Sequence, residues 1–397
     1  MNPNWQTKKL GDLYDITSSK RVFKSEWKRN GVPFYRAREI VKLAKQGYVN
    51  NDLFISDEMY KKYSEKYGAP KEGDIMVTGV GTLGICYVVK KDDKFYFKDG
   101  NIIWLRTKNE ADSRLIEYAF KSDVFKKQIN DGKGATVGTY TIIKAKNTSI
   151  PLPSLDEQKR IANKLDEVSE KVTKAKDNAE KNLQNSKELF ELYLQSVFSN
   201  PGKNWEETKL GDAYDVRDGT HDSPRYQKEG FALITSKNLK RDLLNFNKVK
   251  YISEKDYKKI NDRSKVDKED ILFAMIGTIG NPVVVEVEPN FAIKNVALFK
   301  IPKEQSAYFL KYFLDSRFVI DKMMSEAKGT TQKFVGLGYL RSFKIKLPPL
   351  VEQKTIVKKL EILSLETRKL EKIYEQKLSD LEELKKSILS KAFHAEL

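Results

Sequence analysis

The sequence predicts an α+β protein with two tandem-repeated mixed α/β domains, each followed by a long helix, the two helices pairing as an antiparallel coiled coil. Three observations predict this class. The length of 397 residues exceeds that of a usual single domain, several motifs occur twice in the same order, and each copy ends in apolar residues at heptad spacing. The expected segments are a first domain over residues 1–153, a helix over 154–200, a second domain over 201–349 and a helix over 350–397.

The internal repeat is seen at four ordered places, which chance agreement rarely produces. The offset between the copies shortens along the chain, as small loop deletions would cause. The paired motifs are Trp5 with the run Lys9-Leu10-Gly11-Asp12 and Trp205 with Lys209-Leu210-Gly211-Asp212, Gly81-Thr82-Leu83-Gly84 and Gly277-Thr278-Ile279-Gly280, the segments that start at Ile150 and Ile345, and the segment ends at 194–198 and 389–393. The chain is therefore two copies of one unit.

A long helix after each domain is predicted from apolar residues at alternating steps of four and three, the pattern of a helix that packs along another helix. Each helix of roughly 40 residues would be roughly 60 Å long. Thr367 and Lys377 interrupt the second series, so looser packing is expected there. A coiled coil between two chains would show the same pattern, but duplication makes pairing within one chain the simpler solution. The residues expected at this packing seam are Ile161, Leu165, Val168 and Val172 in the first helix and Ile356, Leu360, Leu363 and Leu370 in the second.

The composition points to a polyanionic partner. The formal net charge is +17 and the isoelectric point is about 9.4, which favours nucleic acid, and no apolar run approaches the roughly 20 residues that span a membrane. The single cysteine, Cys86, and the lack of a signal-peptide pattern predict a cytoplasmic location. With only two histidines, His221 and His394, the sequence lacks the ligands of a Cys/His zinc site, and no metal site is expected.

Several local patterns are similar to catalytic or nucleotide-binding motifs but fail on their context. Residues 79–84 match Gly-x-Gly-x-x-Gly, yet a strand follows where a dinucleotide site needs a helix. Glu157 and Glu352 begin Glu-x-Lys patterns like half a nuclease site, but both lie in the first helical turn, where an acid complements the helix dipole. The run that starts at Ser223 departs from the Pro-Pro motif of amino-methyltransferases. His221 has no convincing triad partners, so its loop either contacts DNA or is an ordinary solvated turn. No catalytic residue is expected.

A domain that ends in a Leu-Pro-x-x-x-Glu-Gln-x-x-Ile motif and leads into a long helix occurs twice, at 152–161 and 347–356. This order of features resembles the specificity subunits of type I restriction-modification enzymes over essentially the whole chain. The Lys-Leu-Gly-Asp openings, both Gly-Thr-x-Gly turns, the run 219–221 and the ending 391–397 add to the resemblance. Pro349 stands where the first copy has the helix-capping Ser154, which is a minor departure.

The resemblance implies a sequence-specific, non-catalytic DNA-binding subunit. Its two domains would be target-recognition domains, each reading half of a split asymmetric site in double-stranded DNA, and its helix pair would set the half-site spacing. Two methyltransferase subunits would dock on the helices, and restriction subunits would add translocation and cleavage. The chain itself would hold no cofactor, because S-adenosylmethionine, ATP and Mg²⁺ belong to the partner subunits. The alternative is a coiled-coil scaffold that reads no DNA; it predicts neutral loops at the Gly-Thr positions, where this chain is basic.

Candidate DNA-binding residues follow from the side chains that read bases, namely Arg or Lys for guanine and Asn or Gln for adenine. Contacts to phosphates are expected to outnumber contacts to bases. For any single lysine, an ordinary solvated charge is the competing interpretation. The candidates are Ser19, Lys20, Arg21, Arg36, Arg38, Lys133 and Thr136 in the first domain, and Thr220, His221, Arg225, Ser236, Lys237, Asn238, Thr330, Thr331, Gln332 and Lys333 in the second.

Overall fold

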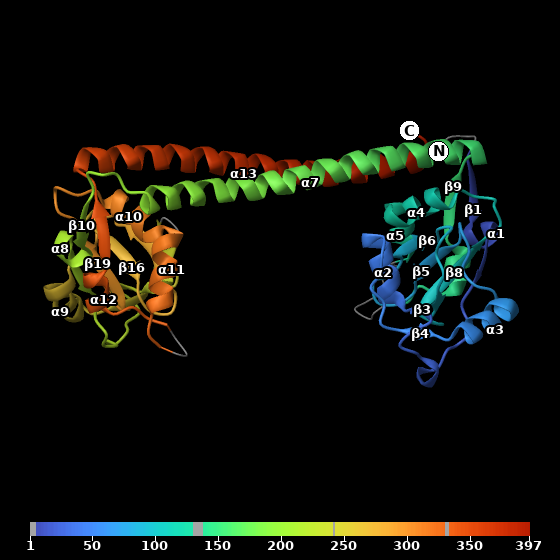
Figure 1. Ribbon diagram of the computed structural model, residues 1–397, viewed down its shortest axis with the longest axis horizontal. Helices are drawn as coiled ribbons and strands as arrows, with labels where there is room; N and C mark the ends of the chain where they lie inside the picture. The colour runs from blue at the N-terminus through green and yellow to red at the C-terminus, as the bar shows by residue number, and fades with distance from the viewer. Residues whose placement is uncertain (1–4, 130–137, 241–242, 330–332) are drawn as a thin grey trace. The chain divides into compact units, whose positions relative to one another are not determined.

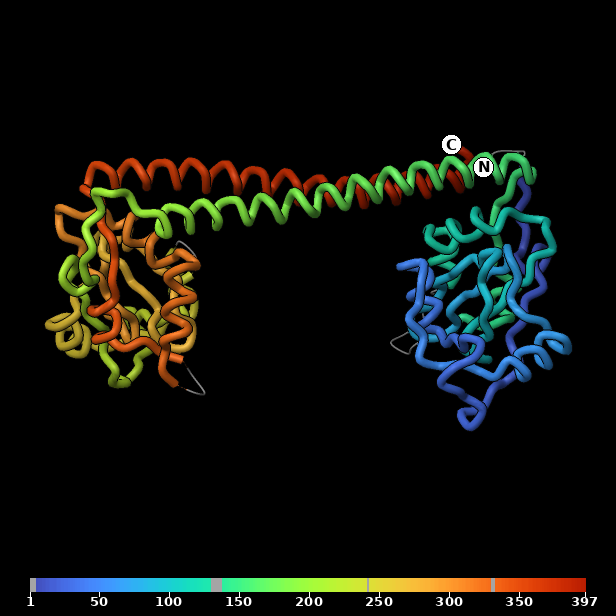
Figure 2. Tube along the Cα trace, viewed as in Figure 1, coloured from blue at the N-terminus to red at the C-terminus, as the bar shows by residue number. Residues whose placement is uncertain are grey.

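The computed structural model describes residues 5–129, 138–240, 243–329 and 333–397. Contacts divide the chain into two compact units, which are seen in the ribbon and tube views (Figure 1, Figure 2). Unit 1 comprises Met1–Ala179 with Gln376–Leu397, and unit 2 comprises Glu180–Glu375. Each unit therefore contains one mixed domain together with parts of both long helices.

Unit 1 is built on three small sheets. The antiparallel main sheet has the order β2 (Tyr14–Thr17), β8 (Ile102–Thr107), β5 (Ile75–Thr78) and β6 (Cys86–Val88). A second sheet has the order β4 (Phe54–Ile55), β3 (Val32–Tyr35) and β7 (Tyr96–Phe97), in which β3 and β7 are parallel. The third pairs β1 (Gln6–Lys9) with β9 (Ser149–Leu152). The helices of this domain are α1 (Leu10–Leu13), α2 (Ala37–Gln46), α3 (Asp57–Tyr67), α4 (Ser113–Lys121), α5 (Asp123–Ile129) and α6 (Ile142–Asn147), with a 3₁₀ turn at Lys24–Glu26.

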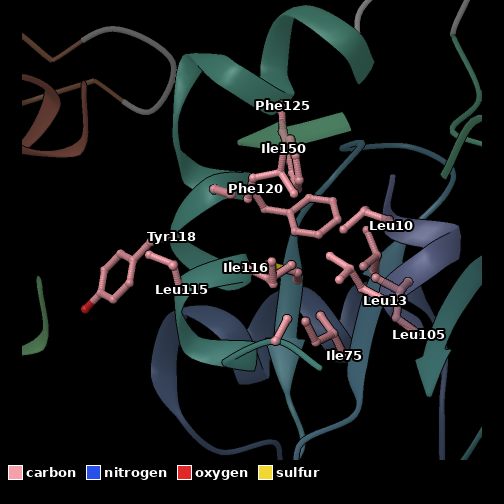
Figure 3. Close-up of a cluster of buried hydrophobic side chains, with 14 of the residues drawn as sticks. Leu10, Leu13, Ile75, Leu105, Leu115, Ile116, Tyr118, Phe120, Phe125 and Ile150 are labelled. Carbon is pink, nitrogen blue, oxygen red and sulfur yellow. The ribbon is translucent and has the colours of Figure 1, made fainter. Parts of the chain in front are cut away.

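The core of unit 1 lies between the main sheet and α4. Asp112 caps α4 by accepting a hydrogen bond from the backbone N–H of Arg114 at 2.9 Å. The helix then buries Leu115, Ile116 and Phe120 against the sheet. Figure 3 shows these side chains meeting residues of α1, β5 and β8. Burying a side chain of this size stabilises the fold by roughly 1.5–3 kcal/mol.

Unit 2 repeats this topology. Its main sheet has the order β11 (Asp215–Asp218), β19 (Val296–Lys300), β16 (Ile271–Ala274) and β17 (Gly280–Val284). The second sheet has the order β15 (Lys250–Ile252), β12 (Phe231–Ile234) and β18 (Phe291–Ile293), and the third pairs β10 (Glu206–Lys209) with β20 (Lys344–Leu347). The helices are α8 (Leu210–Ala213), α9 (Glu254–Ser264), α10 (Ala307–Asp315), α11 (Arg317–Glu326) and α12 (Leu337–Ser342).

The two domains differ directly after the first strand of the second sheet. In unit 1, β3 leads into the ten-residue helix α2. In unit 2, β12 leads into a 3₁₀ turn at Ser236–Asn238 and then the short pair β13 (Leu239–Lys240) and β14 (Leu243–Leu244). The repeat therefore keeps its sheets and changes the segment between them.

The long helices α7 (Leu155–Ser199) and α13 (Leu350–Phe393) pair in antiparallel fashion. In unit 1 the start of α7 and the end of α13 share one core, which includes Leu165 and Phe393. In unit 2 the end of α7 and the start of α13 do the same through Leu194 and Leu360. The predicted fold class is confirmed: two mixed domains, each followed by a long helix, with the helices in contact.

Most residues predicted at the packing seam are buried, but the second helix differs at one place. Ile161, Leu165, Val172 and Leu360 are buried, and Val168, Ile356 and Leu363 are partly buried. Leu370 is 38% exposed, whereas Thr367, which was expected to interrupt the seam, is 3% exposed. The hydroxyl of Thr367 donates to the carbonyl of Leu363 at 2.9 Å, so its polar atom is satisfied within the helix. The seam therefore runs through Thr367, and Leu370 is the more exposed of the two residues.

The Glu-Gln motif at the start of each long helix has a structural role. Gln158 is buried; its Oε1 accepts from the backbone N–H of Asp112 at 3.0 Å, and its Nε2 donates to the carbonyl of Pro153 at 3.0 Å. Gln353 accepts from the backbone N–H of Ser306 at 2.9 Å and donates to the carbonyl of Pro348 at 2.8 Å. In each unit this glutamine therefore fastens the long helix to the cap of α4 or α10.

Candidate nucleic-acid interface

The turn after β3 and the turn after β12 have the same backbone arrangement. The backbone N–H of Arg36 donates to Oε2 of Glu39 at 2.9 Å, and the backbone N–H of Thr235 donates to Oδ1 of Asn238 at 2.9 Å. Both acceptor side chains are buried, with exposures of 1% for Glu39 and 6% for Asn238. The residue directly before the acceptor is therefore held at the surface in both domains: Arg38 in the first and Lys237 in the second.

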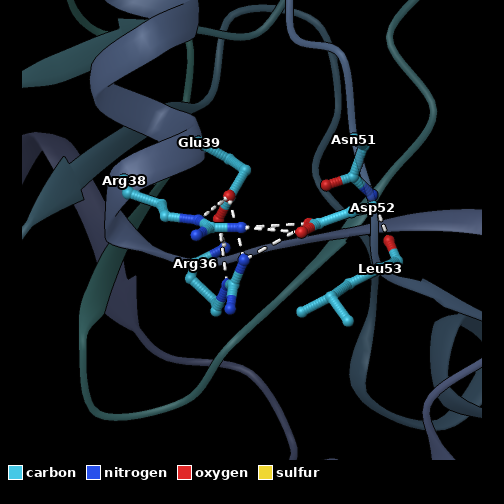
Figure 4. Close-up of polar contacts among 6 residues, drawn as sticks. All are labelled: Arg36, Arg38, Glu39, Asn51, Asp52 and Leu53. Carbon is cyan, nitrogen blue, oxygen red and sulfur yellow. Dashed lines mark hydrogen bonds and ion pairs between the residues drawn. The ribbon is translucent and has the colours of Figure 1, made fainter.

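In unit 1 this turn carries a cluster of two arginines and two carboxylates (Figure 4). Arg36 donates from Nε and Nη2 to the two carboxylate oxygens of Glu39, each at 3.2 Å. Arg38 donates from Nε to Glu39 and from Nη2 to both oxygens of Asp52, at 3.0 and 3.1 Å. We call these four residues, Arg36, Arg38, Glu39 and Asp52, the arginine cluster.

The arginine cluster stays fully charged at neutral pH. Burial alone would raise the pKa of Glu39, but hydrogen bonds from Arg36 and Arg38 hold it below its ordinary value. The hydrogen bond from Arg38 likewise lowers the pKa of Asp52, and that to Glu39 raises the pKa of the Arg38 guanidinium. Two positive charges face two negative ones, so the cluster offers oriented N–H donors with little net charge.

In unit 2 the same turn borders a basic cleft of about 800 Å³. Among the described residues that line it, five are lysines, four are asparagines and none is a carboxylate. The ammonium group of Lys250 lies 4.0 Å from the ring centre of Tyr226, a cation–π contact that holds this lysine at the wall. The lysines are Lys237, Lys240, Lys248, Lys250 and Lys294, and the asparagines are Asn238, Asn245, Asn247 and Asn295.

The loop that contains His221 is fastened to the edge of this cleft. The backbone N–H of Thr220 donates at 3.0 Å to the carbonyl of Ile293, the last residue of β18. Nδ1 of His221 lies 2.9 Å from Oδ1 of Asn295, and Nε2 lies 2.9 Å from Oδ2 of the buried Asp218. Arg263 pairs with the other oxygen of Asp218. Both ring nitrogens are thus engaged by an amide and a carboxylate, and neither faces a nucleophile.

The corresponding loop of unit 1 follows β2 and lies beside β7. The hydroxyl of Ser19 donates to the carbonyl of Phe97 at 2.6 Å, and the backbone N–H of Lys20 donates to the hydroxyl of Tyr96 at 3.1 Å. Arg21 pairs with Asp99 at 2.9 Å and stays largely exposed. Because β7 pairs with β3, this loop and the turn after β3 belong to one edge of the domain.

The remaining predicted DNA-binding residues are less well supported. Arg225 and Ser236 lie by the cleft, Arg225 exposed and Ser236 in its lining. Lys333 donates to the carbonyl of Met324 at 3.0 Å, so its ammonium group is directed to the end of α11. Lys133, Thr136, Thr330, Thr331 and Gln332 lie outside the described residues.

Several residues of this edge were missed by sequence reasoning. Asp52 completes the arginine cluster, and Lys248, Lys250 and Lys294 line the basic cleft. Asp52 lies just before β4, Lys248 and Lys250 lie before and at the start of β15, and Lys294 follows β18, so strand pairing brings them to the turn. The one usable signal was the alternation of lysines in the run Lys248-Val249-Lys250.

The described residues contain no group of three or more His, Cys, Asp or Glu side chains arranged to hold a metal ion. Within that same part of the chain, no helix is both long and apolar enough to cross a membrane. A duplicated α+β frame with donor-rich polar edges in both copies defines a two-domain binding protein directed at nucleic acid.

Comparisons with known proteins identify the family. A model of the type I restriction modification DNA specificity domain matches residues 2–182 and 202–379. The specificity subunit of the EcoBI enzyme from Escherichia coli is 24% identical over 437 residues, covering 100% of this chain and 87% of that protein. A putative specificity subunit from Haemophilus influenzae, S.HindORF215P, is 27% identical over 192 residues; that match spans 48% of this chain and 47% of that protein.

Solved structures share the fold. A chain from a structure of the assembly and conformational transition of a type I R-M system has a TM-score of 0.75 at 21% identity, covering 100% of this chain and 99% of that chain. The HsdS subunit from Thermoanaerobacter tengcongensis has a TM-score of 0.69 at 19% identity, covering 100% and 98%. Since the family model matches most of its length, the chain belongs to the family of type I restriction-modification DNA specificity subunits, the non-catalytic and cofactor-free components of these enzymes.

Proposed function

We propose that this chain reads a split, asymmetric site in double-stranded DNA, one half with each domain, residues 1–153 and 201–349 being the two target-recognition domains. Helices α7 and α13 set the spacing of the halves and carry two methyltransferase subunits, which methylate adenine. Restriction subunits join the same complex. The partner subunits hold S-adenosylmethionine, ATP and Mg²⁺, and the complex acts in the cytoplasm.

The observation that carries this proposal is the pair of equivalent turns after β3 and β12. Both turns are closed by the same backbone hydrogen bond, whereas the polar groups around them are arginines with carboxylates in one and lysines with asparagines in the other. Arg and Lys recognise guanine, Asn recognises adenine, and lysines without acidic neighbours attract phosphates. Different polar groups on one frame are what two domains need to read different half-sites. A scaffold without DNA reading offers no reason for a cleft lined by five lysines.

The length and rigidity of the helices support the spacing role. α7 has 45 residues and α13 has 44, which corresponds to rods of roughly 65 Å. Half-sites read from one face of B-DNA lie about 34 Å, or a multiple of this, apart. A paired helical rod keeps such a distance, which a flexible linker does not.

Partner docking is supported by exposed leucines at repeat-equivalent positions of the two helices. Leu189 of α7 is 49% exposed and Leu384 of α13 is 45% exposed. The first belongs to unit 2 and the second to unit 1, so each unit presents one of them. An exposed leucine at the same position of both copies gives each unit one equivalent apolar contact point, which suits two identical methyltransferase subunits. We expect Leu189→Glu and Leu384→Glu each to remove one bound methyltransferase, measured as a mass decrease of the purified complex.

The proposed function is tested by modified-base sequencing of DNA from cells that express this chain with its methyltransferase, against the methyltransferase alone. We expect adenine methylation at one split, asymmetric motif only when both proteins are present. Absence of methylation in a verified complex would contradict the proposal. Titration of DNA onto the full chain at graded salt then separates a scaffold, which binds no DNA, from a DNA-binding subunit whose methyltransferase is inactive.

A further inference from the structure

We propose that Arg38 reads a guanine in the half-site of the first domain, with Arg36, Glu39 and Asp52 as the residues that position it. This inference rests on the proposed function and adds to it a specificity-determining residue and the base that this residue selects. Three features of the arginine cluster favour guanine as the base that Arg38 contacts. They are the orientation of Arg38, the charge balance of the cluster and the different residues of the second domain.

The guanidinium of Arg38 is held on two sides. Its Nε donates to Glu39, which is itself buried and held by Arg36, and its Nη2 donates to both oxygens of Asp52. Nη1 takes part in none of the hydrogen bonds among the described residues, and the side chain is 54% exposed. The Nη1 edge therefore faces outward in a fixed plane. The N–H groups of Nη1 can donate to O6 or N7, the acceptors that guanine presents in the major groove, where arginine makes its commonest base contact.

The charge of the cluster favours a base over a phosphate. Arg36 and Arg38 are balanced by Glu39 and Asp52. A phosphate would meet the exposed carboxylate of Asp52 and be repelled, since like charges at this range disfavour each other. The edge of guanine carries two uncharged acceptors, so it gains the hydrogen bonds of Arg38 without that repulsion. Asp52 thus selects against backbone contact while it orients Arg38.

The second domain has neither an arginine nor a carboxylate at the positions equivalent to Arg38 and Asp52. Lys237 stands in the place of Arg38, directly before the buried Asn238. In the strand register, Val32 pairs with Ile55 and Phe231 pairs with Ile252. Asp52 and Val249, each three residues before the paired isoleucine, therefore correspond. Among the described residues Lys237 has no carboxylate partner, and a lysine is a compact point charge that lacks the planar guanidinium. The guanine-reading geometry is accordingly a property of the first domain alone.

The test uses the full chain with its methyltransferase and compares wild type with Arg38→Gln, Arg38→Lys and Asp52→Asn. Modified-base sequencing reports which bases are accepted at each position of the methylated motif. Wild type should select guanine roughly 10- to 100-fold over other bases at one position. Arg38→Gln should bring that preference close to parity at this position, Arg38→Lys should weaken it, and both should leave the other half unchanged. Asp52→Asn should weaken the same preference severalfold.

Two control variants distinguish a loss of guanine preference from a loss of the folded state. Asp52 is largely exposed, so Asp52→Asn should keep the wild-type Tm, and a changed preference with unchanged Tm cannot come from unfolding. Lys237→Gln should leave the guanine position intact. The inference is overturned if the Arg38 variants lower methylation evenly without altering the motif, if the relaxed position is not a guanine, or if Asp52→Asn leaves the preference as in wild type. A wild-type complex without a split motif would instead overturn the proposed function and this inference with it.

Discussion

The turns after β3 and β12 show which parts of this duplicated chain are kept and which change. Each turn is closed by a backbone N–H that donates to a buried side chain three residues later, Glu39 in one domain and Asn238 in the other. Around that shared bond, one domain has arginines balanced by carboxylates, and the other has lysines whose cleft contains no carboxylate among the described residues. The bond that holds the backbone is conserved between the copies, whereas the exposed groups are not. Folding and recognition are therefore assigned to different side chains of the same turn.

The largest expected effect tests whether the end of each long helix stabilises the unit in whose core it packs. Phe393 packs in the core of unit 1, and Phe198, its equivalent, packs in unit 2 against Phe309 and Phe313. Replacing either by Ala should cost about 3–5 kcal/mol of unfolding free energy through a cavity. Hydrogen exchange should report the loss in unit 1 for Phe393→Ala and in unit 2 for Phe198→Ala. Equal loss in both units for either variant would contradict this division.

A smaller effect is expected from the glutamines of the Glu-Gln motif. Gln158→Met and Gln353→Met keep the side-chain size but leave a backbone N–H and a carbonyl without their partners. Each should cost about 1–3 kcal/mol in its own unit, measured by thermal unfolding of the full chain. The exposed neighbour Lys159→Met serves as the control and should leave the Tm unchanged. If the control is as destabilising as Gln158→Met, the hydrogen bonds are not the cause.

The different charge of the two edges should appear in the salt dependence of DNA binding. Lys237→Gln removes an uncompensated charge of the basic cleft and should lower the slope of log K against log salt by about 0.9, one phosphate contact. Arg38→Gln, at the equivalent position of the first domain, should leave the slope nearly unchanged, because Arg38 is expected to contact a base and not a phosphate. Equal slope changes for the two variants would remove the distinction between the edges.

The smallest effect concerns pH. Glu39 has a folded-state pKa below the ordinary value of 4.5, so its contribution to stability is present above that value and is lost as the pH falls through the lower folded pKa. Asn238 does not titrate, so the turn of unit 2 should be indifferent in this range. Hydrogen exchange at the two turns between pH 5 and pH 3, about the range in which Glu titrates, should show opening only at Arg36–Glu39. Glu39→Gln should remove the part of the pH dependence that comes from Glu39 and leave the part that comes from Asp52, whose pKa is also lowered.

The sequence predicted the features that are local or repeated. Heptad spacing and the paired motifs lead directly to the two long helices and the duplicated domains, because both patterns are written in contiguous residues. The burial of Thr367 at the seam was not predicted, because the sequence does not show that its hydroxyl donates to a carbonyl of its own helix. The boundaries of the target-recognition domains stay predictions.

The candidate site was predicted only in part. Arg36, Arg38, Lys237 and Asn238 were identified from their residue types, and the structure brings each pair to the equivalent turn. Asp52, which orients Arg38, and the lysines at and before β15 could not be predicted, because strand pairing in the second sheet brings them there from distant sequence. The functional assignment of all these residues stays a prediction.

The central claim is that each domain reads its own half-site on a shared frame, and a chimera tests it most directly. Residues 1–153 are replaced by a second copy of residues 201–349, and the methylated motif is determined by modified-base sequencing. We predict a split palindrome in which the half-site of the second domain appears twice, in inverted orientation. Methylation of the original asymmetric motif, or of a motif containing neither half, would contradict the account.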